Sequence, residues 1–176
     1  LQDLDWSNGL DGYIPFAANI KNSRLHIVQN ETHVNAYSQL FFSYFTAMTL
    51  FDDPALKNVI RKHMNLITNY FLKHNLVLKD NFGNKVPFSD ITSSAFKLSA
   101  GRCLDGLVFV EFSLWILENQ KDSEAYTKLT EIKKEMVSDG YYRKIANLHF
   151  KFFTFELPSD STDWLNFIRL YILNQI

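Results

Sequence analysis

The sequence has little cysteine, proline or glycine. Its 176 residues include one cysteine, Cys103, so no disulfide forms within the chain and the fold must depend on packing. Four prolines and six glycines exclude a collagen-like or low-complexity chain. With 47% hydrophobic and 21% charged residues, we expect a single globular domain or one lobe of a larger one.

The sequence also lacks an excess of either charge. Lysine and arginine total 18 against 19 aspartates and glutamates, which gives a net charge of −1. Such a balance does not favour nucleic acid or an anionic membrane as a partner. Polar residues interrupt every apolar run before it reaches the roughly 18 residues of a membrane span, even in residues 32–51. We therefore expect no nucleic-acid partner and no membrane span.

Motifs for bound groups are missing as well. The five histidines show neither HExxH spacing nor cysteine partners, so no metal site is predicted. The sequence contains no Walker loop, dinucleotide-binding glycine motif or GxSxG elbow. We expect no cofactor.

What the sequence does contain is helical periodicity, with apolar residues at three- and four-residue steps. Three helices with few or no charges are expected to be buried, and two helices with one charged face are expected to meet solvent. Asp53 and Pro54 are predicted to cap and begin the first amphipathic helix. The buried helices are predicted at residues 34–51, 101–119 and 161–176, and the amphipathic ones at 54–73 and 123–138.

The remaining segments are less regular. Residues 76–88 predict a small β-hairpin or an ordered loop around Gly83. Residues 141–157 fit a strand and a helix equally well. Residues 1–29 are expected to form an irregular N-terminal segment before the helical domain of residues 30–176.

The alternation of buried and amphipathic helices predicts an all-α fold of antiparallel hairpins in two layers. Each outer helix brings the chain back, so the inner helices all begin at the same end. That end should gather polar, ionisable and aromatic groups from distant parts of the sequence, namely Asn30, Glu31, Thr32, His33, Arg102, Asp105, Asp160, Asp163 and Trp164.

This organisation resembles the (α/α) toroid of six-hairpin glycosidase-like proteins, in particular uncharacterised bacterial members of that superfamily. Related proteins have serine, arginine and aspartate before the first glutamate, whereas this chain has Val28-Gln29-Asn30. A full toroid has about twice as many hairpins, so the chain resembles a partial toroid. The resemblance is carried by Asn30-Glu31-Thr32, Leu50-Phe51-Asp52-Asp53-Pro54, residues 73–84, Ser123-Glu124-Ala125-Tyr126 and Ser161-Thr162-Asp163-Trp164-Leu165.

The resemblance implies a carbohydrate-active domain, a hydrolase or lyase that acts on an oligosaccharide or a uronate-containing glycan, in the periplasm or outside the cell. Glu31, His33 and Asp163 are then the catalytic candidates, because cleavage of a glycosidic bond needs two titratable groups. An alternative stays open for each of them. Glu31 can complement a helix N-terminus, His33 can satisfy a local hydrogen bond, and Asp163 can cap a helix.

Asn30, Arg102, Asp105 and Trp164 are the candidate substrate-binding residues. A guanidinium such as that of Arg102 binds planar or tetrahedral anions through two hydrogen bonds. It can equally pair with Asp105 within one helical turn. Trp164 can stack on a sugar ring or belong to the core.

The last helix has no amphipathic partner after it. We therefore expect an apolar edge with Phe167, Tyr171 and Ile172 exposed, covered by another copy of the chain or by a further part of this one. This edge supports an alternative function, a non-catalytic helical interaction module that binds a protein partner or self-associates as a homo-oligomer.

Overall fold

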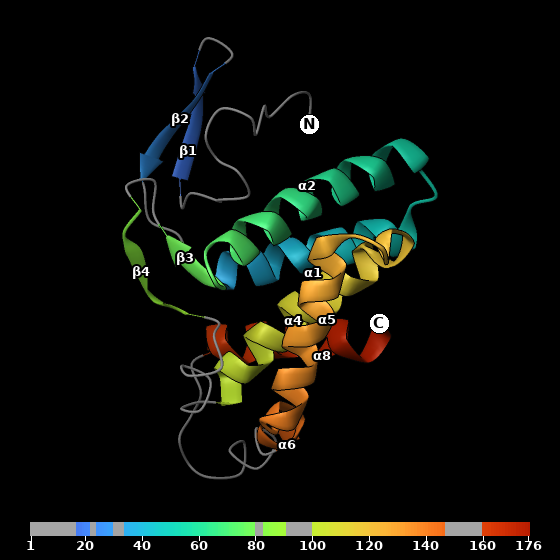
Figure 1. The fold of residues 1–176 in the computed structure, drawn as a ribbon. Coiled ribbons are helices and arrows are strands. Elements are labelled where there is room, and N and C mark those ends of the chain that lie inside the picture. Colours follow the sequence, from blue (N-terminus) through green and yellow to red (C-terminus); the bar gives the residue numbers. More distant parts are fainter. Residues whose placement is uncertain (1–16, 22–23, 30–33, 80–82, 91–99, 147–159) are drawn as a thin grey trace.

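The computed structural model describes residues 17–21, 24–29, 34–79, 83–90, 100–146 and 160–176 (Figure 1). These residues are mostly helical, which confirms the predicted all-α class with a small hairpin. In chain order the elements are β1 (Ala17–Lys21), β2 (Arg24–Gln29), α1 (Val34–Leu50), α2 (Pro54–Lys73), β3 (Val77–Lys79), β4 (Lys85–Asp90), α4 (Ala100–Ile116), the 3-10 helix η1 (Glu118–Gln120), α5 (Glu124–Ser138), α6 (Tyr141–Ala146) and α8 (Asp160–Gln175).

The charge-poor helices α1, α4 and α8 pack against one another as an inner layer. Ring contacts show that α1 and α4 run in the same direction, because Phe41 contacts Phe109 and Phe112, and Phe45 contacts Trp115 further along. All three helices begin on the left of Figure 1 and end on the right. The predicted common starting end is therefore present.

The amphipathic helices cover this layer. Helix α2 runs antiparallel to α1, since Tyr37 contacts Phe71 near one end and Tyr44 contacts His63 nearer the other. Helix α5 returns along α4 after η1 and packs against both α4 and α2. The core lies between the layers and includes Met64, Leu104, Leu107, Phe112 and Leu129, all fully buried.

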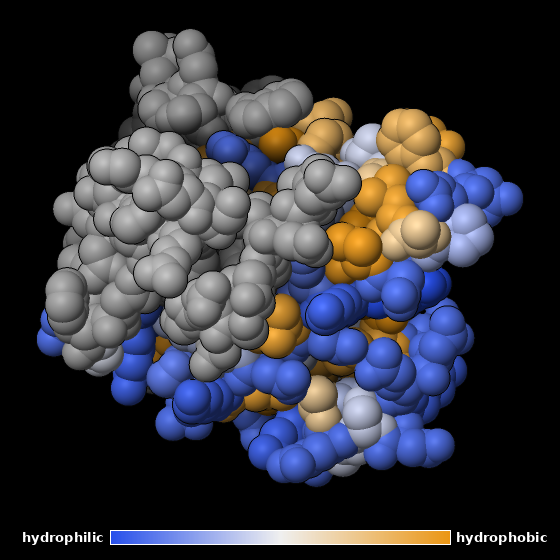
Figure 2. Space-filling model, turned by 90° about the horizontal axis from the view of Figure 1, so that it is seen from above, coloured by the Kyte–Doolittle hydropathy of each residue, from blue (hydrophilic) through white to orange (hydrophobic). Residues whose placement is uncertain are grey.

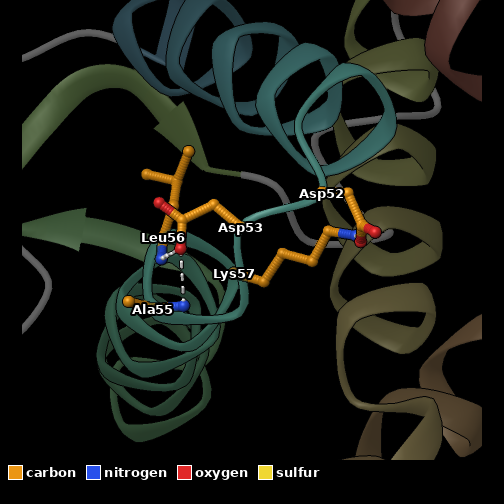
Figure 3. A network of polar contacts seen from close by, with 5 residues as sticks. All are labelled: Asp52, Asp53, Ala55, Leu56 and Lys57. Carbon is orange, nitrogen blue, oxygen red and sulfur yellow. Dashed lines mark hydrogen bonds and ion pairs between the residues drawn. The ribbon is translucent and has the colours of Figure 1, made fainter.

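The capping prediction for α2 is confirmed. Asp53 is the N-cap, and its Oδ1 accepts hydrogen bonds from the backbone N–H of Ala55 at 2.9 Å and of Leu56 at 3.3 Å (Figure 3). Pro54 occupies the first helical position, where no backbone N–H is needed. The side chains of Asp52 and Lys57 form an ion pair at 3.1 Å beside this cap.

The prediction of an irregular N-terminal segment is wrong for residues 17–21 and 24–29, which form two strands. There β1 and β2 form an antiparallel pair in which Lys21 lies opposite Arg24. This hairpin is favoured by the alternation of Arg24, Leu25, His26 and Ile27 in β2 and by a link of only two residues between the strands. The predicted hairpin near residues 76–88 is confirmed as β3 and β4, with Gly83 at a φ of 82°.

The structure also tests three further expectations, which concern helices α6, α8 and α1. Residues 141–146 form helix α6, and the rest of the ambiguous segment lies outside the described residues. Helix α8 begins at Asp160, so Asp163 lies within its first turn and is not the N-cap. Helix α1 is not enclosed on every side, because Gln39 and Ser43 are exposed on the side away from its neighbours.

Candidate functional site

The structure tests the predicted site residues unevenly. Asn30, Glu31 and His33 lie outside the described residues. Arg102, Asp163 and Trp164 fall near the starts of α4 and α8, as predicted, but the description there is limited to the backbone. Asp105 alone among the predicted site residues has a described side chain.

Asp105 belongs to a buried polar cluster that joins the three inner helices. Its carboxylate forms an ion pair with the guanidinium of Arg169 on α8. The Nε of Arg169 donates to Ser38 Oγ on α1 at 3.1 Å, and its Nη1 donates to Asn166 Oδ1 at 3.2 Å. One guanidinium therefore bonds to side chains from α1, α4 and α8. We call Ser38, Asp105, Asn166 and Arg169 the arginine cluster.

Burial controls the electrostatics of the arginine cluster. Arg169 is only 4% exposed. Burial lowers the pKa of Arg169, while the carboxylate of Asp105 raises it by attraction and hydrogen bonding. The guanidinium remains protonated because its ordinary pKa lies far above neutrality. Removing either charge would leave the other one buried and uncompensated.

The arginine cluster lies beyond the first turn of each inner helix and sets how they meet. Ser38 is the fifth residue of α1, Asp105 the sixth of α4 and Arg169 the tenth of α8. The described partner of the Asp105 carboxylate is Arg169, a residue that sequence reasoning did not include in the site. The available indication was that Arg169 is the only charged residue between Trp164 and Ile176.

A second polar cluster lies on the other side of α4. Glu111 accepts a hydrogen bond from Lys133 Nζ at 2.7 Å and another from Tyr142 Oη at 2.6 Å. It joins α4 to α5 and α6. The pKa of Tyr142 is raised mainly by burial and further by its hydrogen bond to Glu111. The side chain of Lys133 is 39% exposed, so this cluster is in contact with water.

Two polar contacts join α2 to the inner layer. Tyr44 Oη lies 3.0 Å from His63 Nδ1, and Thr68 donates to Ser113 Oγ at 3.2 Å in the core. Burial raises the pKa of Tyr44 to about 12. Burial and the nearby charge of Lys62 lower the pKa of His63. Both contacts connect α2 to the inner layer, the first from α1 and the second from α4.

The predicted apolar edge is present on α8, with one correction. Phe167 is 62% exposed and Tyr171 is 42% exposed, and their rings stack with centroids 6.5 Å apart. Tyr171 also contacts Phe42 on α1, so the edge extends across both helices. Ile172 was expected to be exposed but is fully buried, because it lies on the opposite side of α8 from Phe167. We call Phe42, Phe167 and Tyr171 the α1–α8 face.

Two general features of a site can be checked over the described part of the chain. There, no group of three or more His, Cys, Asp or Glu side chains is placed to hold a metal ion. None of the described helices combines the length and apolarity that crossing a membrane requires.

Comparisons of the chain with protein families, curated proteins and solved structures find no match.

Proposed function

We propose that the chain is a non-catalytic helical interaction module and that it self-associates through the α1–α8 face. The observation that carries this proposal is the exposure of Phe167 and Tyr171, at 62% and 42%, on a helix that packs on α1 and α4. Large aromatic side chains that remain in water on one face usually mark an interface.

A second copy of the chain is the occupant that the charges favour. Helix α1 carries no charged residue, and the only charge between Leu165 and Gln175 is the buried Arg169. In a two-fold dimer the same surface meets itself, so any charge on it would face a like charge. The α1–α8 face is free of that repulsion, and it offers no charge by which an acidic or basic partner would be selected.

Sedimentation equilibrium of the wild-type chain and of Phe167→Asp tests this proposal. We expect a reversible dimer for the wild type and a dissociation constant raised by more than about tenfold in the variant, because the new carboxylate meets its own copy. Val137→Asp is the matched control, since Val137 is 50% exposed on α5, away from this face. A monomeric wild type, or equal dimerisation of Phe167→Asp and the wild type, would contradict the proposal.

A carbohydrate-active function is the second candidate, and the common starting end of α1, α4 and α8 favours it. This arrangement brings the starts of α4 and α8, with Arg102, Asp163 and Trp164, to one end of the inner layer. In this proposal Glu31, His33 and Asp163 transfer protons, and Asn30, Arg102, Asp105 and Trp164 bind the sugar. The inner helices would form part of a toroid.

A reducing-sugar assay on neutral and uronate-containing oligosaccharides tests this second candidate. The proposal expects turnover that falls by about 100-fold or more in Glu31→Gln and in Asp163→Asn. Lys134→Gln, a change at an exposed position of α5, is the control that should retain activity. Absence of turnover in the wild type, or full activity in both carboxylate variants, would contradict it.

A further inference from the structure

Positive charge is concentrated in one stretch of the chain. Residues 54–79 contain five lysines and arginines and no aspartate or glutamate. This leaves 13 basic against 19 acidic residues elsewhere, a net charge of −6. A nearly neutral chain therefore carries a basic region formed by α2 and β3. The five residues are Lys57, Arg61, Lys62, Lys73 and Lys79.

Two of these lysines lie on one face of α2. Lys62 and Lys73 are eleven residues apart, which is three helical turns, so they point the same way about 16 Å apart along the axis. Both are exposed, as are Asn58 and Asn69 on the same stripe. We call Asn58, Lys62, Asn69 and Lys73 the α2 stripe. It combines cations with amides that can donate and accept hydrogen bonds.

The lysines of the α2 stripe are not neutralised by ion pairs within the described part of the chain. Lys57 is paired with Asp52, but Lys62 and Lys73 have no ion pair among the described residues. On α5, in contrast, Lys128 and Lys133 are paired with Glu124 and Glu111. The positive charges also affect neighbouring side chains. The pKa of His74 is lowered mainly by burial and further by the charges of Lys79 and Lys73. The pKa of His63 is lowered mainly by burial and further by the charge of Lys62.

Exposed apolar residues occur at the end of the α1–α2 hairpin where the stripe begins. Leu50 is 73% exposed, Phe51 57% and Val59 40%. Seen from above, hydrophobic side chains gather on one part of the coloured surface, beside hydrophilic ones (Figure 2). An apolar contact area beside spaced charges is the usual composition of a protein interface.

We propose that the α2 stripe binds an acidic segment of another protein, with aspartate or glutamate side chains on Lys62 and Lys73. The surface fits nucleic acid less well, because the described residues of α2 expose no aromatic ring for base stacking and few cations for phosphates. It also fits an anionic bilayer less well, since the exposed carboxylates of Asp52 and Asp53 follow Leu50 and Phe51 directly.

This surface is separate from the one used for self-association. Helix α2 lies above α1 in Figure 1 and α8 lies below it. The two proposals can therefore fail independently, and the dimerisation of each stripe variant shows which of them is affected.

Fluorescence anisotropy with a labelled 20-residue poly-L-glutamate probe tests the inference on the full chain. We expect salt-sensitive binding that weakens by about tenfold in Lys62→Glu/Lys73→Glu, because two attractive pairs become repulsive. Dimerisation should stay as in the wild type. Lys134→Glu, which reverses an exposed charge on α5, is the matched control and should bind as the wild type does.

Three outcomes would overturn the inference: no binding of the probe at low salt, equal binding by Lys62→Glu/Lys73→Glu and the wild type, or tighter lysine-dependent binding of a 20-base-pair DNA duplex, heparin or phosphatidylglycerol vesicles. If the double variant unfolds, Lys62→Gln/Lys73→Gln replaces it. This milder variant should still weaken binding of the probe, and unchanged binding would count equally against the inference.

Discussion

Two carboxylates on helix α4 have different surroundings, although they are only six residues apart. Asp105 points to α8 and pairs with Arg169, whose side chain is 5% exposed. Glu111 points to α5 and pairs with Lys133, whose side chain is 39% exposed. An ion pair removed from water resists loss of one partner far more strongly than a hydrated one. The same helix thus has a rigid attachment on one side and a weaker one on the other.

The largest expected effect is at the buried pair. Arg169→Ala should lower the free energy of unfolding by about 3–5 kcal/mol, because the Asp105 carboxylate stays buried without its cation. Urea denaturation followed by circular dichroism measures this. Asp105→Leu/Arg169→Met should recover much of the loss, since it removes both charges. A loss below about 1 kcal/mol in Arg169→Ala would show that the arginine cluster does not hold the inner layer together.

The hydrated pair of Glu111 and Lys133 should contribute less to the free energy of unfolding. Glu111→Gln is expected to cost about 1–2 kcal/mol, because the hydrogen bond to Tyr142 is weakened while Lys133 can turn to solvent. The same urea titration gives the value. The pKa of Tyr142 should fall toward its ordinary value, which a spectrophotometric titration can follow. If Glu111→Gln costs as much as Arg169→Ala, burial does not account for the contrast between the two sides of α4.

Removal of the α2 cap should have a smaller effect. Asp53→Ala is predicted to cost about 1 kcal/mol, because two backbone N–H groups lose their acceptor. Asp53→Ser keeps an acceptor and should retain most of the stability. The thermal midpoints of the two variants provide the measurement. Equal midpoints for Asp53→Ala and the wild type would mean that α2 is held by packing alone.

The smallest effect concerns pH. The pKa of His63 in the folded chain lies below its ordinary value, so the unfolded chain binds more protons near pH 6.5. The contribution of neutral His63 is present above that pH and is lost as the pH falls through the folded pKa. His63→Gln should therefore lose less stability than the wild type between pH 7.5 and pH 5.5 in urea titrations. An identical loss would assign the pH dependence to other groups.

Local patterns predicted the helices, but they did not predict how distant residues meet. Charge content separated inner from outer helices because burying a charge is costly, and Asp53-Pro54 marked the start of α2 because both residues suit a helix N-terminus. The bond between Ser38 and Arg169 joins residues 131 positions apart, which periodicity cannot show. The exposed side of α1 was missed because its polar residues are uncharged.

The candidate site was less predictable than the fold. The sequence pointed to one end of the inner layer, and the described polar contacts lie further along the helices, around Arg169. The only indication of that cluster was Arg169 itself, the one charged residue between Trp164 and Ile176. The apolar edge was anticipated for Phe167 and Tyr171, but not the burial of Ile172, since the orientation of α8 depends on its contacts with α1 and α4.

The parallel arrangement of the charge-poor helices α1, α4 and α8 is the central claim about the fold, and the carbohydrate-active candidate depends on it. Spin-label distances test it most directly. Nitroxides on exposed positions of α1 and α8 in a Cys103→Ala background would give two pairs, Thr49 with Asn174 and Gln39 with Asn174. In the arrangement described, the Thr49–Asn174 distance is the shorter one, because ten residues of α1 correspond to about 15 Å. A shorter Gln39–Asn174 distance would mean that α1 and α8 run in opposite directions and would contradict the account.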